Sequence, residues 1–338
     1  MRTRGHDTLQ KLYIEPSSKC NLNCAMCFRN GWIGEQQGFM EDAVFDRILA
    51  SLRAMPPVRV LFGGMGEPLL HPRLPQWIAG LHEASCRTEL ITNGTLLDPA
   101  LSLELLRCGL DRVWVSMEGF SREACGLDRR GSTLNGLTAN LEGYNRARER
   151  CGRGELGIAF VMLPENMTEL NRINAFADRY GADALNISHA IPAGPVSREE
   201  ALFRDRYPVG EMARWRSDFS PPKADYCRFV SEGNCFVRWD GDVAPCMQLL
   251  HECSTYLFEE KRRVHRRSFG SIRHSSLREI WESEEYSLFR ARVKAFDFPS
   301  CVHCDGCDDR LSNMTDCAFN PFPTCGACLW AQGIIFCP

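Results

Sequence analysis

Short apolar runs alternate with amphipathic segments along the first two-thirds of the 338-residue chain. The apolar runs are rich in Val, Ile, Leu and Phe, and they are Leu12–Glu15, Val58–Phe62, Glu89–Thr92, Arg112–Ser116, Gly157–Leu163 and Ala184–Ser188. Apolar residues recur at helical spacing in the segments between them, which are Met40–Ala54, Leu74–Ala84, Leu101–Arg107, Leu134–Arg150 and Leu170–Tyr180. Strands that alternate with helices predict βαβ units and therefore a parallel α/β sheet. Six such units fit a partial (β/α)6 TIM-like barrel, although periodicity alone also permits an open doubly wound sheet.

The pattern changes after the sixth apolar run. Prolines at 192–195 and the Ser-Pro-Pro sequence at 220–222 interrupt it, and a helical segment, Arg198–Phe219, lies between them. We therefore predict a barrel over residues 1–195, a helical linker over 196–220 and a cysteine-rich domain over 221–338. The length of the chain suits one barrel-sized domain and one smaller domain.

The cysteine-rich part contains two local elements. Phe236–Cys246 has strand-like runs on either side of an Asp-Gly turn. It predicts a hairpin that returns Cys246 to the neighbourhood of Cys235 or Cys227. Apolar residues at helical spacing in Ser276–Lys294 predict one helix.

Charge and hydropathy exclude two classes of partner. The chain has 40 Lys and Arg residues against 43 Asp and Glu residues, for a net charge of −3. This net charge differs from the strongly positive charge by which general nucleic-acid-binding proteins contact phosphates. No run of about 18 apolar residues indicates a membrane span, and the N-terminal segment has no apolar core of a signal peptide. We expect a cytoplasmic protein that binds neither nucleic acid nor membranes.

Cysteine is abundant and unevenly distributed. In a reduced compartment, 18 cysteines indicate metal ligation rather than a disulfide framework. Eleven of them follow residue 226. Four are scattered through the middle of the chain, where we expect small buried apolar side chains: Cys86, Cys108, Cys125 and Cys151.

Three further cysteines stand together directly after the first apolar run. Cys20, Cys24 and Cys27 have the spacing C-x3-C-x2-C. Three thiolates on one loop can hold three corners of a [4Fe–4S] cluster and leave one iron open to a small ligand. The alternative is a zinc ion with a distant fourth ligand such as His71 or Cys86.

Other turn-forming and polar residues follow the later runs. Ligands of parallel α/β folds collect at the carboxyl ends of strands, so these residues are candidate contacts. Glycines in the second connection allow close approach of the backbone to a ligand. The candidates are Gly63, Gly64, Gly66 and Glu67 after the second run, Asn93 after the third, Ser116 and Glu118 after the fourth, Asn166 after the fifth and His189 after the sixth.

The cysteine loop, with Phe28 beside its last cysteine, resembles the radical S-adenosylmethionine (SAM) superfamily. The resemblance implies a partial barrel in which the open iron chelates SAM. Reduction then cleaves SAM to a 5′-deoxyadenosyl radical that abstracts hydrogen from a substrate. It further implies that Glu67 lies near the amino group of SAM and that Asn93 and Ser116 belong to the SAM-binding wall. Glu118 departs from the S-x-D-G pattern that relatives often show at this place.

The cysteine-rich part resembles the SPASM extension, an auxiliary-cluster domain of radical SAM maturases. The resemblance begins with Cys227-x13-Gly241-x4-Cys246, whereas the later cysteines depart from the usual spacing. It implies two auxiliary [4Fe–4S] clusters, without a division of the ligands between them. Zinc bound by the C-x2-C pairs is the alternative. The candidate ligands are Cys227, Cys246, Cys301, Cys304, Cys307, Cys317, Cys325, Cys328 and Cys337, with Cys235 as a further candidate.

Longer motifs resemble a narrower family, the radical SAM maturases associated with tungsten-containing oxidoreductases of the aldehyde:ferredoxin type. The motifs include YIEPSSKCNLNCAMCFRNGW, LFGGMGEPLLHP, VRWDGDVAPC and the ending PTCGACLWAQGIIFCP. The resemblance implies modification of such an oxidoreductase or of its tungsten–pterin cofactor, with ferredoxin or flavodoxin as electron donor.

Two other functions stay open from the sequence. One is modification of a ribosomal peptide or a sulfatase-like protein, because those families share the auxiliary-cluster extension. The other is a non-catalytic iron–sulfur or zinc protein for electron transfer or binding, although such a protein does not need the open-iron loop. The basic run from Lys261 to Arg267 is a hypothetical docking site for an acidic electron donor.

Overall fold

The computed structural model describes residues 8–120, 133–190, 192, 194, 195, 197, 224–320 and 325–335. The predicted helix Arg198–Phe219 lies outside these residues, as do Cys125 and Cys337. The strands are β1 (Lys11–Ile14), β2 (Arg59–Phe62), β3 (Thr88–Thr92), β4 (Arg112–Met117), β5 (Glu155–Met162), β6 (Ala184–His189), β7 (Asn234–Val237), β8 (Val243–Ala244), β9 (Cys253–Leu257) and β10 (Glu260–Val264). The helices are α1 (Asp42–Arg53), α2 (Leu74–Glu83), α3 (Pro99–Arg107), α5 (Leu134–Cys151), α6 (Leu170–Arg179), α9 (Arg228–Ser231), α10 (Leu277–Glu282) and α11 (Glu284–Ala295).

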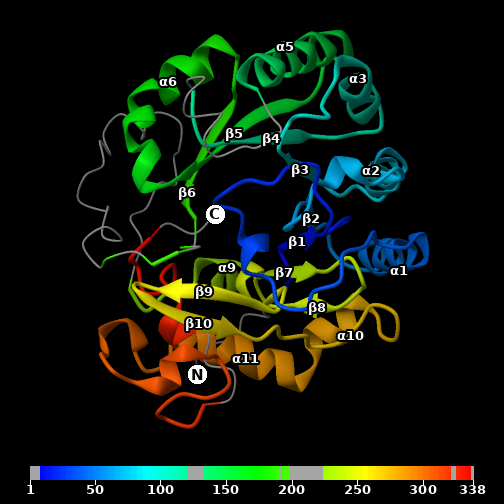
Figure 1. Cartoon of the computed structure of the whole chain (residues 1–338). Coiled ribbons are helices and arrows are strands. Elements are labelled where there is room, and N and C mark those ends of the chain that lie inside the picture. Colours follow the sequence, from blue (N-terminus) through cyan, green and yellow to red (C-terminus); the bar gives the residue numbers. More distant parts are fainter. Residues whose placement is uncertain are drawn as a thin grey trace, which may run out of the picture.

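The first six strands form a parallel sheet in sequence order, β6-β5-β4-β3-β2-β1. Each strand is joined to the next through a helical connection, and Figure 1 shows α1, α2, α3, α5 and α6 in an arc outside the sheet. The predicted partial (β/α)6 barrel is therefore confirmed. All six strands and these five helices lie within two residues of their predicted positions.

The barrel core fills the space between the sheet and this arc of helices. The apolar residues of β4 alternate between buried and half-buried, whereas β5 is buried along most of its length. Phe45 of α1 stacks on Trp77 of α2, with ring centroids 4.4 Å apart. α3 begins at a strong helix-start signal. Asp98 caps it by accepting hydrogen bonds from two backbone N–H groups, and Pro99 occupies the first turn.

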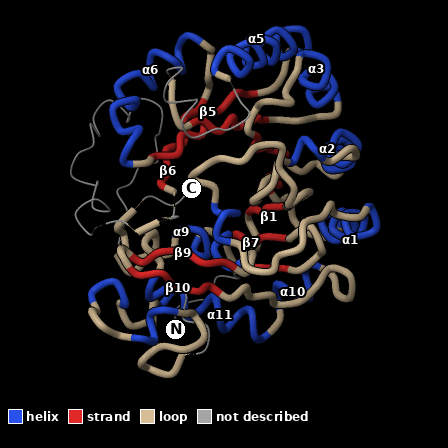
Figure 2. Tube along the Cα trace, in the orientation of Figure 1, coloured by secondary structure: helices blue, strands red, loops and turns tan. Residues whose placement is uncertain are grey.

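The sheet continues into the cysteine-rich part of the chain. β7 pairs with β1 in parallel, in a register that places Lys11 opposite Asn234 and Ile14 opposite Val237. β8 pairs antiparallel with β7 around the Asp-Gly turn, so the predicted hairpin is confirmed. Figure 2 shows β7 beside β1, with β9 and β10 as a separate pair below them. The hairpin of the predicted C-terminal domain thus extends the barrel sheet, while the boundary at residue 221 stays a prediction.

The prediction of a single helix over Ser276–Lys294 is wrong, since two helices occupy this stretch. Ser283 has extended backbone between α10 and α11, and its hydroxyl caps the second helix by accepting from the N–H of Tyr286. Ser276 caps α10 in a reciprocal capping box with Glu279. Helical periodicity continues through the break, whereas the capping serine interrupts the backbone.

The junction between β1 and β7 yields a test of backbone packing. Gly233 has φ +73°, and a Cβ built on it would lie 2.5 Å from the carbonyl oxygen of Thr8. Gly152 has a similar φ of +63°, but a Cβ there would meet nothing within 4 Å. Gly152→Ala should cost about 1 kcal/mol for its left-handed backbone, and Gly233→Ala should cost roughly 1–3 kcal/mol more. Thermal melting of the two variants checks this, and equal losses would contradict the close β1–β7 approach.

Candidate active site and iron–sulfur sites

The three clustered cysteines lie on the loop that leaves β1. The N–H of Cys27 donates to the carbonyl of Cys24 at 3.2 Å, and the side-chain amide of Asn30 donates to the same carbonyl at 3.0 Å. Burial raises the pKa of the Cys27 thiol, and the neighbouring Cys20 and Glu118 act in the same direction. The loop therefore holds Cys20 and Cys27 close together, with Cys24 between them in a hydrogen-bonded turn.

The two side chains considered as a fourth zinc ligand are engaged elsewhere. Nε2 of His71 lies 2.9 Å from the carbonyl oxygen of Met40, and its Nδ1 accepts from the N–H of Arg73 at 3.2 Å. Cys86 is buried in the barrel core, as predicted, whereas Cys108 and Cys151 pack against that core half-buried. Within the described part of the chain, no three His, Cys, Asp or Glu side chains converge closely enough to hold a single metal ion.

The glycine-rich connection after β2 packs against the segment that precedes the cysteines. A Cβ on Gly66 would lie 2.1 Å from the carbonyl oxygen of Ser17 and 2.5 Å from that of Lys19. Gly64 has φ +136° and lies against Glu15, at the carboxyl end of β1. The connection, which begins at Gly63, therefore requires glycine for close backbone approach to the cysteine loop.

Glu67 ties this connection to the turn after β3. Its carboxylate is 2% exposed and accepts hydrogen bonds from Thr92 Oγ1 at 2.7 Å and from the N–H of Asn93 at 2.8 Å. The N–H of Leu69 adds a third bond at 3.0 Å. The amide of Asn93 in turn donates to Cys20 Sγ at 3.8 Å. The predicted SAM contacts Glu67 and Asn93 therefore lie beside the cysteine loop.

The ends of β4 to β6 contribute buried polar groups. Ser116 donates to Glu118 at 3.4 Å, and the Glu118 carboxylate is near enough to Cys27 to affect its pKa. The amide of Asn166 donates to the Glu118 carbonyl at 2.7 Å, so Asn166 braces this loop. Burial lowers the pKa of His189 to about 4, which keeps its ring neutral. Glu118, which departs from the family pattern, is therefore placed at the cysteine loop.

A buried charge network, which sequence reasoning missed, joins the cysteine loop to the C-terminal part of the chain. Nε2 of His251 lies 2.9 Å from Glu15 Oε1, and its Nδ1 lies 3.2 Å from Glu35 Oε2. Arg238 also pairs with Glu35, at 2.9 Å. His251 and Glu15 are fully buried. We call Glu15, His251, Glu35 and Arg238 the interdomain network. Its members are far apart in sequence and no spacing motif relates them.

Backbone contacts support the same junction. The N–H of Ile33 donates to the carbonyl of Glu252 at 3.0 Å, and Trp32 forms an isolated bridge with Cys253. A Cβ on Gly31 would lie 2.2 Å from the carbonyl oxygen of Ser254. The segment that follows the three cysteines thus lies directly on the start of β9. Part of the wall around the cysteine loop therefore comes from beyond residue 221.

The pKa values of two members of the interdomain network, His251 and Glu35, favour their ionised forms. Burial disfavours the charged ring of His251, but attraction to Glu15 and hydrogen bonds to Glu15 and Glu35 outweigh it and raise the pKa of His251. Burial also disfavours the Glu35 carboxylate, yet the bonds from His251, the Glu252 N–H and Arg238 lower its pKa. The network therefore alternates negative and positive charges across the junction.

Eight cysteines of the C-terminal part fall into two groups, and Cys253, which is buried on β9, belongs to neither. Cys325 interacts electrostatically with Cys227, Cys246 and Cys328, and Cys246 with Cys227 and Cys328. Burial raises the pKa of Cys227 to about 12, so only binding to a metal would keep these thiolates deprotonated in such a site. We call Cys227, Cys246, Cys325 and Cys328 the inner cysteine set.

The second group lies nearer the surface. Cys301 interacts with Cys304 and Cys317, and Cys307 follows Cys304 on the same loop. Cys304 and Cys317 are exposed. We call Cys301, Cys304, Cys307 and Cys317 the outer cysteine set. Four thiols in each group fit the ligand count of a [4Fe–4S] cluster.

Cys235 is not brought to either set. It lies on β7 in the barrel core, opposite Leu12, and interacts there with Tyr286 and Arg290. The hairpin places Cys246 near Cys227, and the two interact electrostatically. Cys337 lies outside the described residues.

Comparisons with known proteins agree with this arrangement. Residues 14–177 match the model of the radical SAM superfamily, and residues 227–308 match SPASM, an iron–sulfur cluster-binding domain. The tungsten-containing aldehyde ferredoxin oxidoreductase cofactor-modifying protein of Pyrococcus furiosus is 32% identical, over 98% of this chain and 97% of its own length. The chain belongs to the radical SAM superfamily.

More distant relatives align over most of the chain. A PqqA peptide cyclase of Ruegeria pomeroyi is 27% identical, over 87% of this chain and 79% of its own length. Among solved structures, Streptococcus suis SuiB bound to S-adenosylmethionine has a TM-score of 0.62 at 14% identity, covering 88% of this chain and 71% of SuiB. Native anSMEcpe with bound AdoMet and a peptide has a TM-score of 0.61 at 18% identity, covering 94% of both chains. These likenesses show the fold.

No helix in the described residues is long and apolar enough to cross a membrane.

A radical SAM enzyme with a SPASM domain uses SAM and [4Fe–4S] clusters. The loop fits a cluster held by Cys20, Cys24 and Cys27, because the three thiols share one loop and Asn93 donates toward Cys20. A reduced cluster held by these cysteines would supply the electron for SAM cleavage. Glu67 and Asn93 fix the neighbouring loops through their hydrogen bonds.

Iron analysis of paired variants tests the two cysteine sets. Cys246→Ala and Cys328→Ala belong to one set, so the double variant should lose about four irons per chain, as each single variant does. Cys246→Ala combined with Cys304→Ala removes a ligand from each set and should lose about eight. Cys235→Ala serves as the control and should keep all the iron. Loss of about eight irons from the first pair would contradict the division.

The raised pKa of His251 predicts a pH-dependent contribution to stability. A folded pKa above the usual value of about 6.5 means that the charged ring stabilises the fold fully below that pH. This stability is lost as the pH rises through the higher folded pKa. The melting temperature of His251→Gln should therefore fall furthest below that of the wild type near pH 6, and the gap should narrow near pH 9. A gap independent of pH would contradict an ionised His251.

Proposed function

We propose that this protein is a radical SAM maturase that modifies a tungsten-containing oxidoreductase of the aldehyde:ferredoxin type, or its tungsten–pterin cofactor. The observation that carries the proposal is the Pyrococcus furiosus relative, which is named as a modifier of that cofactor and aligns over 97% of its length. Such coverage leaves no large domain of the relative without a counterpart here. The proposal includes two auxiliary [4Fe–4S] clusters, one on each cysteine set.

The geometry supports a reaction that starts at the cysteine loop. The candidate SAM contacts Gly63, Gly64, Gly66, Glu67, Asn93 and Ser116 come from the carboxyl ends of β2, β3 and β4. Their loops pack against the cysteine loop or hydrogen-bond beside it, as described above. In our proposal these residues position SAM.

A peptide-modifying activity is the second candidate. It is favoured by the PqqA peptide cyclase, which aligns over most of this chain but is less similar than the Pyrococcus furiosus protein. Both candidates use the same initiation chemistry, so only the substrate distinguishes them.

Ferredoxin or flavodoxin is the proposed electron donor. The basic run is a poor docking site for it, because two of its arginines already have carboxylate partners and a third is buried. Arg263 pairs with Glu252 at 2.9 Å, and Arg267 pairs with Glu285. Arg262 is 2% exposed. We therefore place no donor contact on this run.

The proposal predicts SAM cleavage that depends on the cysteine loop. After anaerobic reconstitution and reduction with SAM, the wild type should hold roughly twelve irons per chain and release 5′-deoxyadenosine. Cys24→Ala should release none, whereas Cys304→Ala should still cleave SAM but fail to modify the true substrate. Absence of 5′-deoxyadenosine from the wild type under any reductant would refute the enzyme assignment.

The substrate is tested by adding a tungsten oxidoreductase made in cells that lack this maturase. We expect it to increase 5′-deoxyadenosine formation and to acquire a mass change in the protein or its pterin. A PqqA-type precursor peptide is the matched comparison. Stimulation by the peptide alone would favour the second candidate and contradict the first.

A further inference from the structure

Arg262 is a buried cation in the C-terminal part of the chain. It lies on β10 and is 2% exposed, whereas the side chain of its neighbour Arg263 is 53% exposed. Its two terminal nitrogens donate to the carbonyls of Ala327 at 3.5 Å and Ser312 at 3.1 Å. Its Nε is buried without a hydrogen-bond partner. Among the ion pairs of the described residues, none neutralises Arg262, although burying an uncompensated charge is costly.

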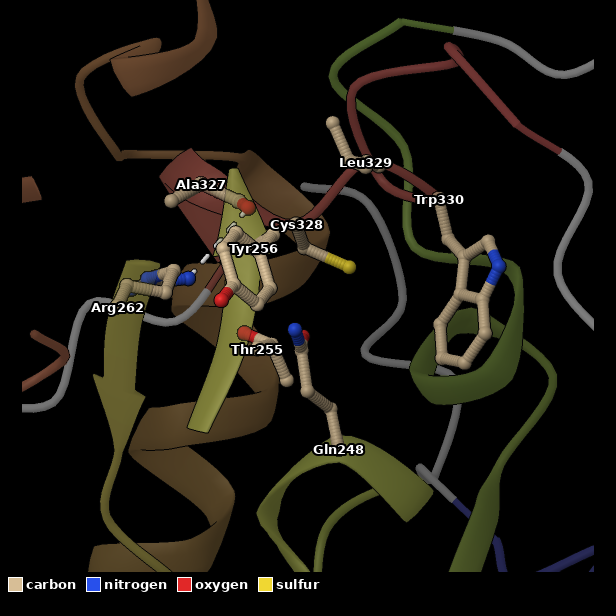
Figure 3. Close-up of a pocket in the computed structure, with 8 residues that line it drawn as sticks. All are labelled: Gln248, Thr255, Tyr256, Arg262, Ala327, Cys328, Leu329 and Trp330. Atoms are coloured by element: carbon tan, nitrogen blue, oxygen red, sulfur yellow. Dashed lines mark hydrogen bonds between the residues drawn. The ribbon is translucent and has the colours of Figure 1, made fainter. Parts of the chain in front are cut away.

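A small cavity lies between Arg262 and Cys328. Figure 3 shows both residues on its wall, with Thr255 and Tyr256 of β9 between them. The cavity offers about 10 Å³ to the centre of a water molecule, which is room for about one water. It is therefore too small for an organic substrate, so the charge of Arg262 needs another explanation.

Thiols of both cysteine sets lie near Arg262, as does Cys253, which belongs to neither set. Burial lowers the pKa of Arg262, but the neighbouring Cys301 and Cys328 act against that effect. Cys328 is a member of the inner set and Cys301 of the outer set. The two sets adjoin, since a Cβ on Gly326 would lie 3.5 Å from Cys301 Sγ. The guanidinium is thus positioned to act on both groups of four thiols.

We propose that the guanidinium of Arg262 is the fixed counter-charge of the two auxiliary clusters and raises their reduction potentials. One-electron reduction adds one negative charge to a cluster and transfers no proton, so a buried cation nearby favours the reduced form. Arginine suits this role because its guanidinium stays charged even when buried. Arg262 then acts through the clusters, because it positions a positive charge beside them, and it contacts no substrate. The inference rests on the proposed function only for the presence of the two clusters.

The test is a redox titration of the reconstituted holoprotein, followed by electron paramagnetic resonance. Arg262→Met and Arg262→Gln remove the charge, and Arg262→Lys keeps a cation. Arg263→Met is the matched control, because it removes an exposed charge from the adjacent residue of the same strand. Addition of SAM identifies the signal of the cluster on the cysteine loop, since only that cluster has an open iron. Iron content and melting temperature are measured for every variant.

We expect both neutral variants to keep their iron and to shift the auxiliary-cluster potentials to more negative values. Arg262→Lys should shift them less, Arg263→Met should leave them unchanged, and the SAM-cluster potential should stay constant. Unchanged auxiliary potentials in the neutral variants would overturn the proposal. Loss of iron from all three Arg262 variants would also overturn it, since the residue would then be structural. Fewer than three clusters in the wild type would instead contradict the proposed function.

Discussion

The buried interdomain network is the constraint on which the active site depends. His251 lies between the carboxylates of Glu15 and Glu35, and Arg238 continues the alternation of charges. Removing one partner of such a network leaves an unpaired buried charge, which typically costs about 3–5 kcal/mol. The network fixes the cysteine loop against residues 251–254, so the loop has one position relative to both parts of the chain. A radical enzyme needs this, because a loosely held site would admit water and competing donors.

The same constraint explains why the barrel and the cysteine-rich part are not separable in this protein. β7 extends the barrel sheet beside β1, and the hairpin it forms carries Cys246 into the inner cysteine set. The inner set is therefore connected through a few residues of sheet to the strand that precedes the cysteine loop. The outer set lies beyond it, near the surface. In this arrangement the inner set is the nearer of the two to the barrel sheet.

Local sequence patterns predicted the barrel well because each of its elements is specified locally. Strand runs, helical periodicity and turn residues agree with one another from β1 to β6, as in any consistent fold. The cysteine loop could be predicted equally well, since its three thiols are within eight residues. Contacts between distant segments could not be predicted. The pairing of β7 with β1, the partners of His251 and the division of the cysteines all join segments that are distant in sequence. Composition cannot specify such contacts. The break between α10 and α11 at Ser283 was not predicted, because helical periodicity continues across it.

We propose that one chain holds three iron–sulfur sites, of which one is open and two are closed by separate sets of four cysteines. Anomalous diffraction from anaerobic crystals of the reconstituted protein with SAM tests it most directly. Peaks at the iron edge should appear at the cysteine loop, at the inner set and at the outer set, with SAM on the first alone. Peaks at the zinc edge in the C-terminal part, or one cluster shared between the two sets, would contradict this account.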